Sequence, residues 1–404
     1  MIDSRAANAP IQCHTDVVGS LLRPGELLRA REELAAGRMA ASAFEEIEDR
    51  AVDDAIRLQE EAGLDIVTDG EMRRLSFQSQ MTEAVAGFGA WDIDAFLWGE
   101  WHGPRSGSGG EGKDAGGDVH GDGDGDGDGD GEAGVWSRAR PAGLGVTGKL
   151  ERKRFLSAGE FVYLRDRARR MPKVTLPSPG LFANFWSPEI SRGVYPTLDG
   201  FLEDVAGILR QEVEELARLG AGYIQIDAPH YPLLLDAKTR AFYESRGWTL
   251  ERWLDLGIAL DNAVMADLPG VTFGLHLCRG NQGSRWLVEG GYEAIAAPIF
   301  RRVRAGRLLL EYDDARSGSF APLAHVPDDR TVVLGLVSTK HAVLEDSGLL
   351  LRRIDEAAQY IDRERLALSP QCGFATSILG NDLSPAEQAA KLRLVVETAR
   401  RAWG

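Results

Sequence analysis

A regular alternation of apolar, strand-like segments and longer helical segments runs from residue 173 to the end of the 404-residue chain. The six predicted strands cover residues 173–177, 222–227, 271–276, 307–312, 331–336 and 365–369. The helical segments between and after them lie near residues 199–219, 250–267, 290–304, 343–361 and 384–402. A strand followed by a helix, repeated along the chain, is typical of a parallel sheet covered by helices.

Two further strands are predicted before this series, at residues 12–20 and 64–68, with a helical segment at 42–62 that ends at Gly63. Because they raise the number of strands to eight, we expect an α/β chain that forms a single (β/α)8 TIM barrel over residues 1–404. A doubly wound open sheet is the alternative. Its nucleotide-binding version needs a Gly-rich phosphate turn after the first strand, and the sequence has none there.

A Gly/Asp-rich tract covers residues 103–134 and repeats Gly-Asp from 121 to 130. It contains almost no apolar residues that could offset the entropy lost on ordering, so we expect a disordered insertion between the second and third strands. Calcium binding is the alternative, but the repeat of a calcium β-roll carries an apolar residue in each turn. After this tract, residues 143–156 are predicted as a hairpin and residues 157–170 as a helix.

Acidic residues outnumber basic ones by 62 to 46, which gives a formal net charge of −16. Half of this excess lies in residues 111–132, which hold nine acids and one lysine, so the remainder is mildly acidic. This balance argues against nucleic acid as a partner. The sequence has no apolar run long enough to span a membrane, and residues 1–10 lack a signal-peptide core, so we expect a cytoplasmic protein.

Potential metal ligands lie at the carboxyl ends of three predicted strands. His276 and Cys278 are two positions apart at the end of the third strand of the series, so on an extended backbone their side chains point to the same side. Glu311 and Cys372 lie at the ends of the fourth and sixth strands. Each residue alone has an ordinary explanation: a buried thiol, a core histidine or an ion-pair partner. Together, they predict a Zn²⁺ site rather than a disulfide framework.

Six short motifs at these strand ends strongly resemble the catalytic barrel of cobalamin-independent methionine synthase, and more closely its short, single-barrel members. They are Val18-Gly19-Ser20-Leu-Leu-Arg-Pro24, Asp69-Gly-Glu71-x-Arg73, Ile224-Gln-Ile-Asp227-x-Pro229, His276-x-Cys278, Glu311 and Ser369-Pro-Gln-Cys-Gly-Phe374. The resemblance runs from about residue 14 to the C-terminus and excludes the Gly/Asp-rich tract. It implies that zinc is held by His276, Cys278, Glu311 and Cys372.

By the same resemblance, Ser20, Glu71 and Asp227 match the positions that hold homocysteine. Two carboxylates are a suitable clamp for its α-ammonium group, and Gly19-Ser20 offers hydrogen-bond donors for its α-carboxylate. The other interpretation of Asp227 is a helix N-cap. Trp186 lies near the position where full-length enzymes place an aromatic side chain over the folate ring, and its alternative role is packing.

The resemblance implies zinc-dependent methyl transfer to the homocysteine thiol, which gives methionine, with 5-methyltetrahydrofolate as the expected donor. A thiol with a pKa of about 8.5 is mostly protonated at pH 7, and zinc converts it into a thiolate. The departing folate needs a proton, for which Asp227 and the Lys340-His341 pair are the candidates. That pair lies near the position of a catalytic histidine in full-length enzymes, which also carry an extra N-terminal barrel that binds polyglutamated folate.

Other functions stay open at this point. A zinc-dependent alkyltransferase would act on another thiol or use another donor, such as methylcobalamin or an epoxide with coenzyme M. Ser20, Glu71 and Asp227 favour an amino-acid thiol over a sulfonate thiol, which would call for basic residues. A metal-free barrel similar to uroporphyrinogen decarboxylase would need clustered arginines. A purely structural zinc is uncommon at the catalytic face of a barrel. The sequence does not determine the oligomeric state.

Overall fold

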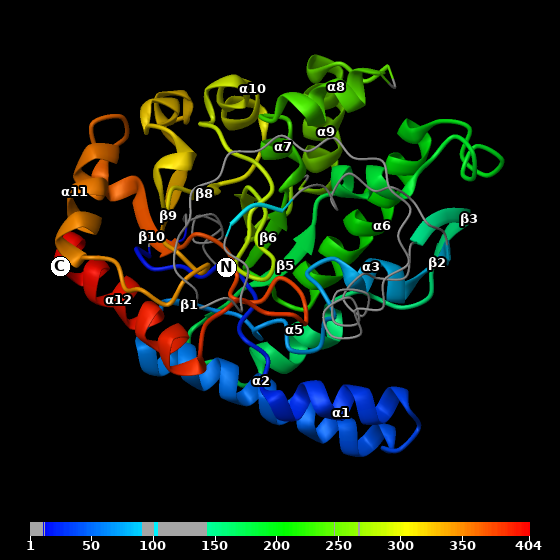
Figure 1. The fold of residues 1–404 in the computed structure, drawn as a ribbon, viewed down its shortest axis with the longest axis horizontal. Coiled ribbons are helices and arrows are strands. Elements are labelled where there is room, and N and C mark those ends of the chain that lie inside the picture. Colours follow the sequence, from blue (N-terminus) through cyan, green and yellow to red (C-terminus); the bar gives the residue numbers. More distant parts are fainter. Residues whose placement is uncertain (1–10, 12, 91–100, 104–143, 246, 266) are drawn as a thin grey trace, which may run out of the picture.

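The computed structural model describes residues 11, 13–90, 101–103, 144–245, 247–265 and 267–404 (Figure 1). The Gly/Asp-rich insertion expected at 103–134 lies outside these residues, apart from Gly103. The described chain has a mixed α/β architecture. In Figure 1 most strands lie around the centre of the view with helices outside them, and one pair of strands lies near the right edge.

Six strands form one sheet, in the order β10-β9-β8-β7-β6-β5. They are β5 (Val174–Pro177), β6 (Tyr223–Asp227), β7 (Thr272–Leu277), β8 (Arg307–Glu311), β9 (Thr331–Val337) and β10 (Leu366–Pro370). All neighbouring strands pair in parallel, and each crossover contains helices or helical turns, as parallel connections require. The six strands predicted from residue 173 onward are therefore confirmed, with their ends shifted by at most one residue.

Short parallel pairings lie next to both edge strands of this sheet, β10 and β5. At one edge, Thr15 forms a parallel bridge with Leu368 of β10. At the other edge, β1 (Ile66–Val67) pairs in parallel with β4 (Met171–Pro172), which precedes β5 by one residue. The N-terminal segment and β1 thus lie at opposite ends of the strand order.

The two early strands predicted at residues 12–20 and 64–68 are much shorter than expected, and the described strands do not form one eight-stranded sheet. A side-chain contact links these two segments where a strand ladder was expected. The Thr68 hydroxyl donates to the Gly19 carbonyl over 2.6 Å. A period-2 sequence pattern does not distinguish such irregular extended backbone from a regular strand.

Amphipathic helices cover the sheet with their apolar sides. They are α2 (Ala41–Ala62), α6 (Leu198–Arg218), α9 (Leu250–Val264), α10 (Glu293–Arg302), α11 (Ser347–Ala357) and α12 (Pro385–Trp403). The other described helices are α1 (Gly25–Ala35), α3 (Ser79–Ala84), α5 (Ala158–Arg165), α7 (His230–Leu233) and α8 (Ala237–Ser245). Their ends follow ordinary capping chemistry. Ser384 and Glu387 form a capping box on α12, and Gly63 ends α2 with a φ of 91°.

An antiparallel pair, β2 (Val85–Ala90) with β3 (Leu144–Arg152), is separate from the main sheet. The hairpin predicted within residues 143–156 is therefore wrong, because this segment supplies one strand whose partner precedes the insertion. Gly148 lies inside β3, where β2 and β3 approach each other closely at Gly87. A Cβ on Gly87 would lie 2.7 Å from the Lys149 carbonyl oxygen.

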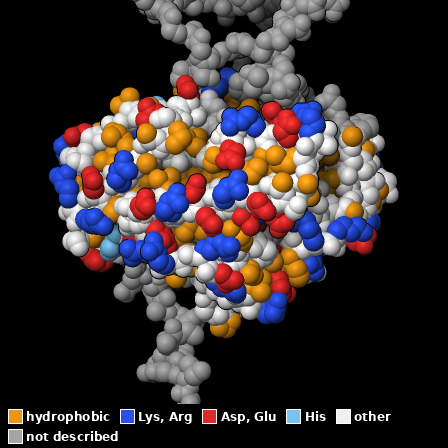
Figure 2. Space-filling model, turned by 90° about the horizontal axis from the view of Figure 1, so that it is seen from below, with side chains coloured by type: hydrophobic (Ala, Val, Ile, Leu, Met, Phe, Trp, Pro, Cys, Tyr) orange, Lys and Arg blue, Asp and Glu red, His pale blue; other side chains and the backbone are white. Residues whose placement is uncertain are grey.

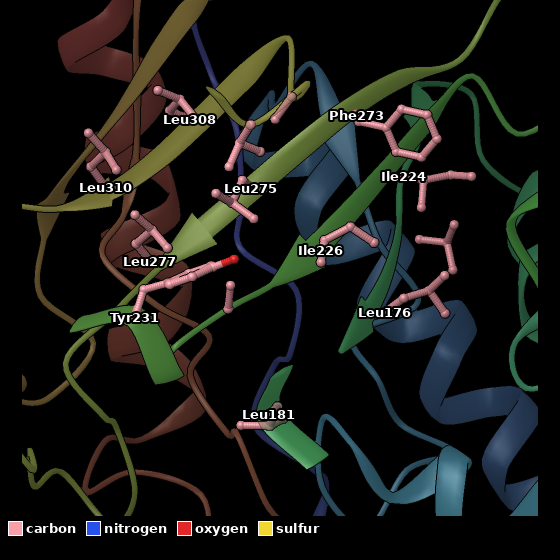
Figure 3. Close-up of a cluster of buried hydrophobic side chains, with 14 of the residues drawn as sticks. Leu176, Leu181, Ile224, Ile226, Tyr231, Phe273, Leu275, Leu277, Leu308 and Leu310 are labelled. Atoms are coloured by element: carbon pink, nitrogen blue, oxygen red, sulfur yellow. The ribbon is translucent and has the colours of Figure 1, made fainter. Parts of the chain in front are cut away.

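The sheet strands divide their side chains between two faces. One set belongs to the large apolar cluster that also contains helix residues such as Leu202 and Leu209 (Figure 3). Figure 3 labels its members Leu176, Leu181, Ile224, Ile226, Tyr231, Phe273, Leu275, Leu277, Leu308 and Leu310. The alternate positions face the other way, because successive side chains of a strand point to opposite faces. They include a small separate cluster of Leu309, Val333 and Ala367.

A substitution at Leu275 tests whether the sheet face that belongs to the large apolar cluster is the core of the protein. Its side chain is fully buried in the large cluster, so Leu275→Ala leaves a cavity and is expected to lower the free energy of unfolding by about 2–5 kcal/mol. Urea titration followed by circular dichroism measures this loss. Leu349→Ala is the control, because Leu349 is 47% exposed and its truncation should change stability by less than about 0.5 kcal/mol. Equal effects of the two variants would contradict the assigned core.

The molecular surface carries charges of both signs. On the face shown in Figure 2, Lys and Arg side chains lie among Asp and Glu side chains. Within the described part of the chain, no helix combines the length and the hydrophobicity needed to cross a membrane.

Candidate active site

A cavity of about 420 Å³ lies at the carboxyl ends of the sheet strands. It brings together residues from segments far apart in the sequence. Six of the residues singled out in the sequence line it: Ser20, Glu71, Asp227, His276, Cys278 and Cys372. Carboxyl ends of parallel strands meet at one edge of a sheet, which explains why polar strand-end residues converge here.

His276, Cys278 and Cys372 form the metal-binding part of this cavity. Their ligand atoms all lie within 4.8 Å of one another, and all three side chains are buried. His276 lies on β7, Cys278 comes directly after this strand, and Cys372 comes two residues after β10. Neither ring nitrogen of His276 has a hydrogen-bond partner among the described residues. An unpartnered buried imidazole beside two thiols fits a zinc ion.

The electrostatics of this cluster favour one ionised thiol. Hydrogen bonding with Cys372 lowers the pKa of Cys278 well below its usual value; burial opposes this shift, and His276 adds to it. Hydrogen bonding with Cys278, together with burial, raises the pKa of Cys372. Burial lowers the pKa of His276, but Cys278, Asp227 and Glu311 outweigh it, so that the pKa is raised overall. These shifts favour a thiolate on Cys278 next to a protonated His276, and a bound metal cation would take the place of the proton on His276.

Glu311, the fourth expected ligand, lies near this cluster but is engaged elsewhere. Its Oε1 accepts a hydrogen bond from Lys340 Nζ over 3.0 Å, and its Oε2 accepts one from the backbone N–H of Arg279 over 2.7 Å. In the described residues its carboxylate is not part of the group of three ligands that lie within 4.8 Å of one another. The structure thus brings three of the four predicted ligands together and holds the fourth with a buried lysine.

Glu71 lines the cavity and is held through one of its two carboxylate oxygens. Its Oε1 accepts from the Thr175 hydroxyl over 2.7 Å and lies 3.6 Å from a guanidinium nitrogen of Arg74. Its Oε2 is buried without a hydrogen-bond partner among the described residues. The backbone of Glu71 has a φ of 54°, a costly conformation for a residue other than glycine. A buried, strained carboxylate with an unused oxygen is suited to receive a positively charged group.

Asp227 ends β6 beside His276, its register partner on β7. Its Oδ1 accepts a hydrogen bond from Gln225 Nε2 over 2.7 Å. Burial raises the pKa of Asp227 to about 7; His276 lowers it and Glu71 raises it further. The alternative interpretation as a helix N-cap is wrong, because α7 begins at His230 with Pro229 in the cap position.

Two glycines give Glu71 and Ser20 the space they occupy. A Cβ on Gly19 would lie 2.6 Å from Glu71 Oε1, and a Cβ on Gly373 would lie 2.0 Å from the Ser20 hydroxyl oxygen. The backbone N–H of Phe374 also donates to the Ser20 carbonyl over 2.8 Å. The segment after β10 is therefore packed directly on the Gly19-Ser20 turn.

Five of the predicted site residues do not line the cavity within the described part of the chain: Gly19, Glu311, Lys340, His341 and Trp186. Burial lowers the pKa of Lys340, but Asp313 and Glu311 raise it more, so Lys340 is held as a cation between these two carboxylates. His341 is exposed. The indole N–H of Trp186 donates to the Tyr195 carbonyl over 3.0 Å, and its neighbour Phe185 lines the cavity instead.

Several cavity residues were not identified from the sequence. They are Phe77, Trp101, Asn281, Gln282 and Thr376. They lie in connecting segments without a repeating pattern, so hydrophobic periodicity gives no indication of them. Asn281 could have been inferred from the sequence, because it lies three residues after the metal-ligand candidate Cys278. It donates hydrogen bonds to the Thr339 hydroxyl over 2.9 Å and to the Gly373 carbonyl over 2.8 Å.

Comparison with known proteins identifies the family of this chain. The model of the cobalamin-independent synthase catalytic domain matches residues 13–98 and 196–401. The uncharacterized protein YxjH of Bacillus subtilis is 32% identical over 391 residues, which cover 96% of this chain and 94% of YxjH. The methionine synthase of Pyrococcus abyssi is 25% identical over 368 residues, or 89% of this chain and 86% of that protein.

A solved structure has the same fold. The putative vitamin-B12 independent methionine synthase from Listeria monocytogenes superposes with a TM-score of 0.68 at 22% identity, covering 98% of this chain and all of that one. The family match includes all three clustered metal-ligand candidates, while Trp101, Leu144 and Phe185 of the cavity lining lie outside it. The chain therefore belongs to the cobalamin-independent methionine synthase family.

Proposed function

We propose that this protein is a zinc-dependent methyltransferase that transfers a methyl group to the thiol of homocysteine and so forms methionine. One observation carries the proposal: a single cavity contains the cluster of His276, Cys278 and Cys372 together with the carboxylates of Glu71 and Asp227. The cluster suits a metal that activates a thiol, and the carboxylates suit the ammonium group of an amino acid.

The metal would be held by His276, Cys278 and Cys372, with Glu311 as the fourth ligand. When bound, zinc supplies a Lewis acid that keeps the substrate thiol deprotonated at neutral pH. Glu311 has the hardest donor atoms of the four and would be the weakest ligand for a metal that prefers thiolates. Lys340 contacts Glu311 at 3.0 Å and would hold its carboxylate in place.

Substrate orientation would come from the protein alone. Glu71 and Asp227 would bind the α-ammonium group, and Ser20 with the Gly19-Ser20 backbone would donate to the α-carboxylate. Burial raises the pKa of Asp227 to about 7, and a bound ammonium group would favour its ionised form, so as an ionised clamp Asp227 would not supply the proton that the departing group needs. Lys340 and His341 lie away from the cavity lining in the described chain, so we assign neither of them that role.

We also propose that the chain forms a closed (β/α)8 barrel that consists of a single domain. The N-terminal segment lies against β10, β1 lies against β4 beside β5, and the Thr68–Gly19 hydrogen bond links these two segments. Together these contacts support a ring, although the backbone ladder is continuous over six strands only. Closure matters for function because it brings Ser20 and Glu71 next to the ligands of β7 and β10.

5-Methyltetrahydrofolate is the donor expected from the family resemblance. The cavity wall is also compatible with a donor that has no polyglutamate tail, because much of the wall is apolar. Its apolar lining residues include Val18, Leu75, Phe77, Leu233, Leu287 and Ile378. The charged side chains among the described lining residues are the carboxylates Glu71, Glu83 and Asp227. These carboxylates offer no attraction to a polyglutamate tail. A donor without such a tail, including methylcobalamin, is therefore the alternative.

A donor screen tests the proposed function. Zinc-loaded protein is incubated with L-homocysteine and either 5-methyltetrahydrofolate carrying one or three glutamates or methylcobalamin, and methionine is measured by mass spectrometry. We expect methionine from at least one donor, with little dependence on glutamate number. If no donor in the screen yields methionine, and another thiol is alkylated instead, the alkyltransferase alternative replaces the proposal.

A further inference from the structure

A hydrogen-bonded chain of buried side chains leads from the amino end of the sheet to Asp227. Lys173 lies just before β5 and its ammonium group contacts Asp16 Oδ1 at 2.8 Å, the Val17 carbonyl, and Gln225 Oε1 at 2.7 Å. Gln225 then donates from Nε2 to Asp227 Oδ1. Lys173, Gln225 and Asp16 are all essentially inaccessible to solvent.

The lysine determines which way the amide of Gln225 points. An ammonium group can only donate hydrogen bonds, and the three N–H groups of Lys173 have three acceptors here. The carbonyl oxygen of the Gln225 amide must therefore face Lys173, and its NH₂ group must face Asp227. A flipped amide would place an NH₂ group against an ammonium group in a buried site, which is costly.

Strand geometry makes this arrangement specific. Gln225 and Asp227 are two positions apart on β6, so their side chains share a face. Gln225 is the register partner of Thr175 on β5, and Thr175 holds Oε1 of Glu71 in the same way that Gln225 holds Oδ1 of Asp227. Each carboxylate of the proposed ammonium clamp thus has one oxygen bound by a neutral donor from neighbouring strands.

We propose that Gln225, oriented by Lys173, is a positioning residue that holds Oδ1 of Asp227 and thereby directs Oδ2 toward the ammonium group of the substrate. This inference rests on the proposed function, in which Asp227 binds that ammonium group. Asp16 anchors the other end of the chain: it accepts from Lys173 and from the Tyr223 hydroxyl over 2.9 Å, and it lies 3.4 Å from a guanidinium nitrogen of Arg307.

The test measures thiol binding to the zinc-loaded protein by calorimetry, so that no methyl donor is needed. Two thiols are compared: L-homocysteine and 4-sulfanylbutanoate, which lacks only the amino group. Gln225→Met keeps the length of the side chain and removes both hydrogen bonds. We expect it to raise the Kd of L-homocysteine about tenfold, on the scale of one charge-assisted hydrogen bond, and to leave the Kd of 4-sulfanylbutanoate within about twofold.

Gln225→Met is also made in the Asp227→Asn variant. This comparison distinguishes a positioning role of Gln225 from a general structural role. In Asp227→Asn, the fixed NH₂ group of Gln225 binds the Asn oxygen and leaves the Asn NH₂ group facing the substrate ammonium. Adding Gln225→Met releases that constraint, so the double variant should bind L-homocysteine at least as well as Asp227→Asn alone. An equal loss from Gln225→Met in both backgrounds, or an equal loss for both thiols, would overturn the inference.

Gln388→Met is the matched control. Gln388 is a buried glutamine on α12 that accepts from the backbone N–H of Leu22, and it has no contact with Asp227. Its replacement should leave the ratio of the two thiol Kd values unchanged. If Asp227→Asn shows no loss specific to L-homocysteine, the proposed function itself fails. If that loss is present but Gln225→Met shows none, only the positioning role fails.

Discussion

Cys372→Ser is expected to remove most of the bound zinc and to abolish methyl transfer. Cys372 is one of three buried ligand candidates whose donor atoms lie within 4.8 Å of one another, and a serine hydroxyl is a much poorer zinc ligand than a thiolate. Changes outside the direct ligand set already cost about 10–100-fold in metal affinity or activity, so loss of a ligand should exceed that range. Elemental analysis of purified protein and methionine formation measure the two effects.

Cys13→Ser is the matched control for this experiment, because Cys13 is the remaining cysteine of the chain and lies outside the cluster. It should retain about one zinc per chain and the transfer activity. Circular dichroism of both variants shows whether the fold is retained. Full activity in Cys372→Ser, or equal zinc loss in both cysteine variants, would show that the metal site is assigned to the wrong residues.

The parallel sheet was predictable because its strands are locally recognisable. Strands such as β8 and β9 are short apolar runs bounded by polar or glycine-containing turns, and every residue of β8 is buried. Their burial on both faces produces continuous hydrophobic runs, which a single sequence shows directly. The helices between them were equally clear, since α6 carries apolar residues at helical spacing over 21 residues.

Segments whose structure depends on distant partners were not predictable in this way. β3 pairs with β2 across the insertion, so no turn near residue 148 marks its partner, and the local hairpin prediction was wrong. The segment near Thr15 has the composition of a strand, but among its described residues the strand pairing is limited to one bridge, between Thr15 and Leu368. Local patterns report which residues favour extended backbone and do not report what lies beside them.

The candidate site was partly predictable for a related reason. His276, Cys278 and Asp227 occupy strand ends, and the topology of a parallel sheet brings strand ends together whatever the connecting loops do. Lys340 and Trp186 were assigned by resemblance in connecting segments, where a displacement of a few residues redirects a side chain. Gln225 belongs to the sequence motif that ends at Asp227. Its role could not be predicted from that motif, because it depends on a contact with Lys173, which lies 52 residues away in the sequence.

Asp227→Asn addresses the identity of the thiol, because it changes the group that would recognise an amino acid. In the structure Gln225 binds Oδ1 of Asp227 and the side chain lines the cavity with Glu71. Asn keeps the size and the bond with Gln225 but removes the negative charge. A charge-assisted contact of this kind contributes about 1.5–3 kcal/mol. We therefore expect kcat/KM for homocysteine to fall by about one to two orders of magnitude.

Zinc content should stay unchanged in Asp227→Asn, because Asp227 is not among the clustered ligand candidates. The reaction of 4-sulfanylbutanoate, which has no ammonium group for Asp227 to bind, should also proceed at the rate of the unaltered protein, if that thiol is a substrate. An equal loss for both thiols would mean that Asp227 acts on the methyl donor or on the metal site. An unchanged kcat/KM for homocysteine would mean that the cavity recognises a different thiol, and the alkyltransferase alternative would then account better for a zinc cluster beside two buried carboxylates.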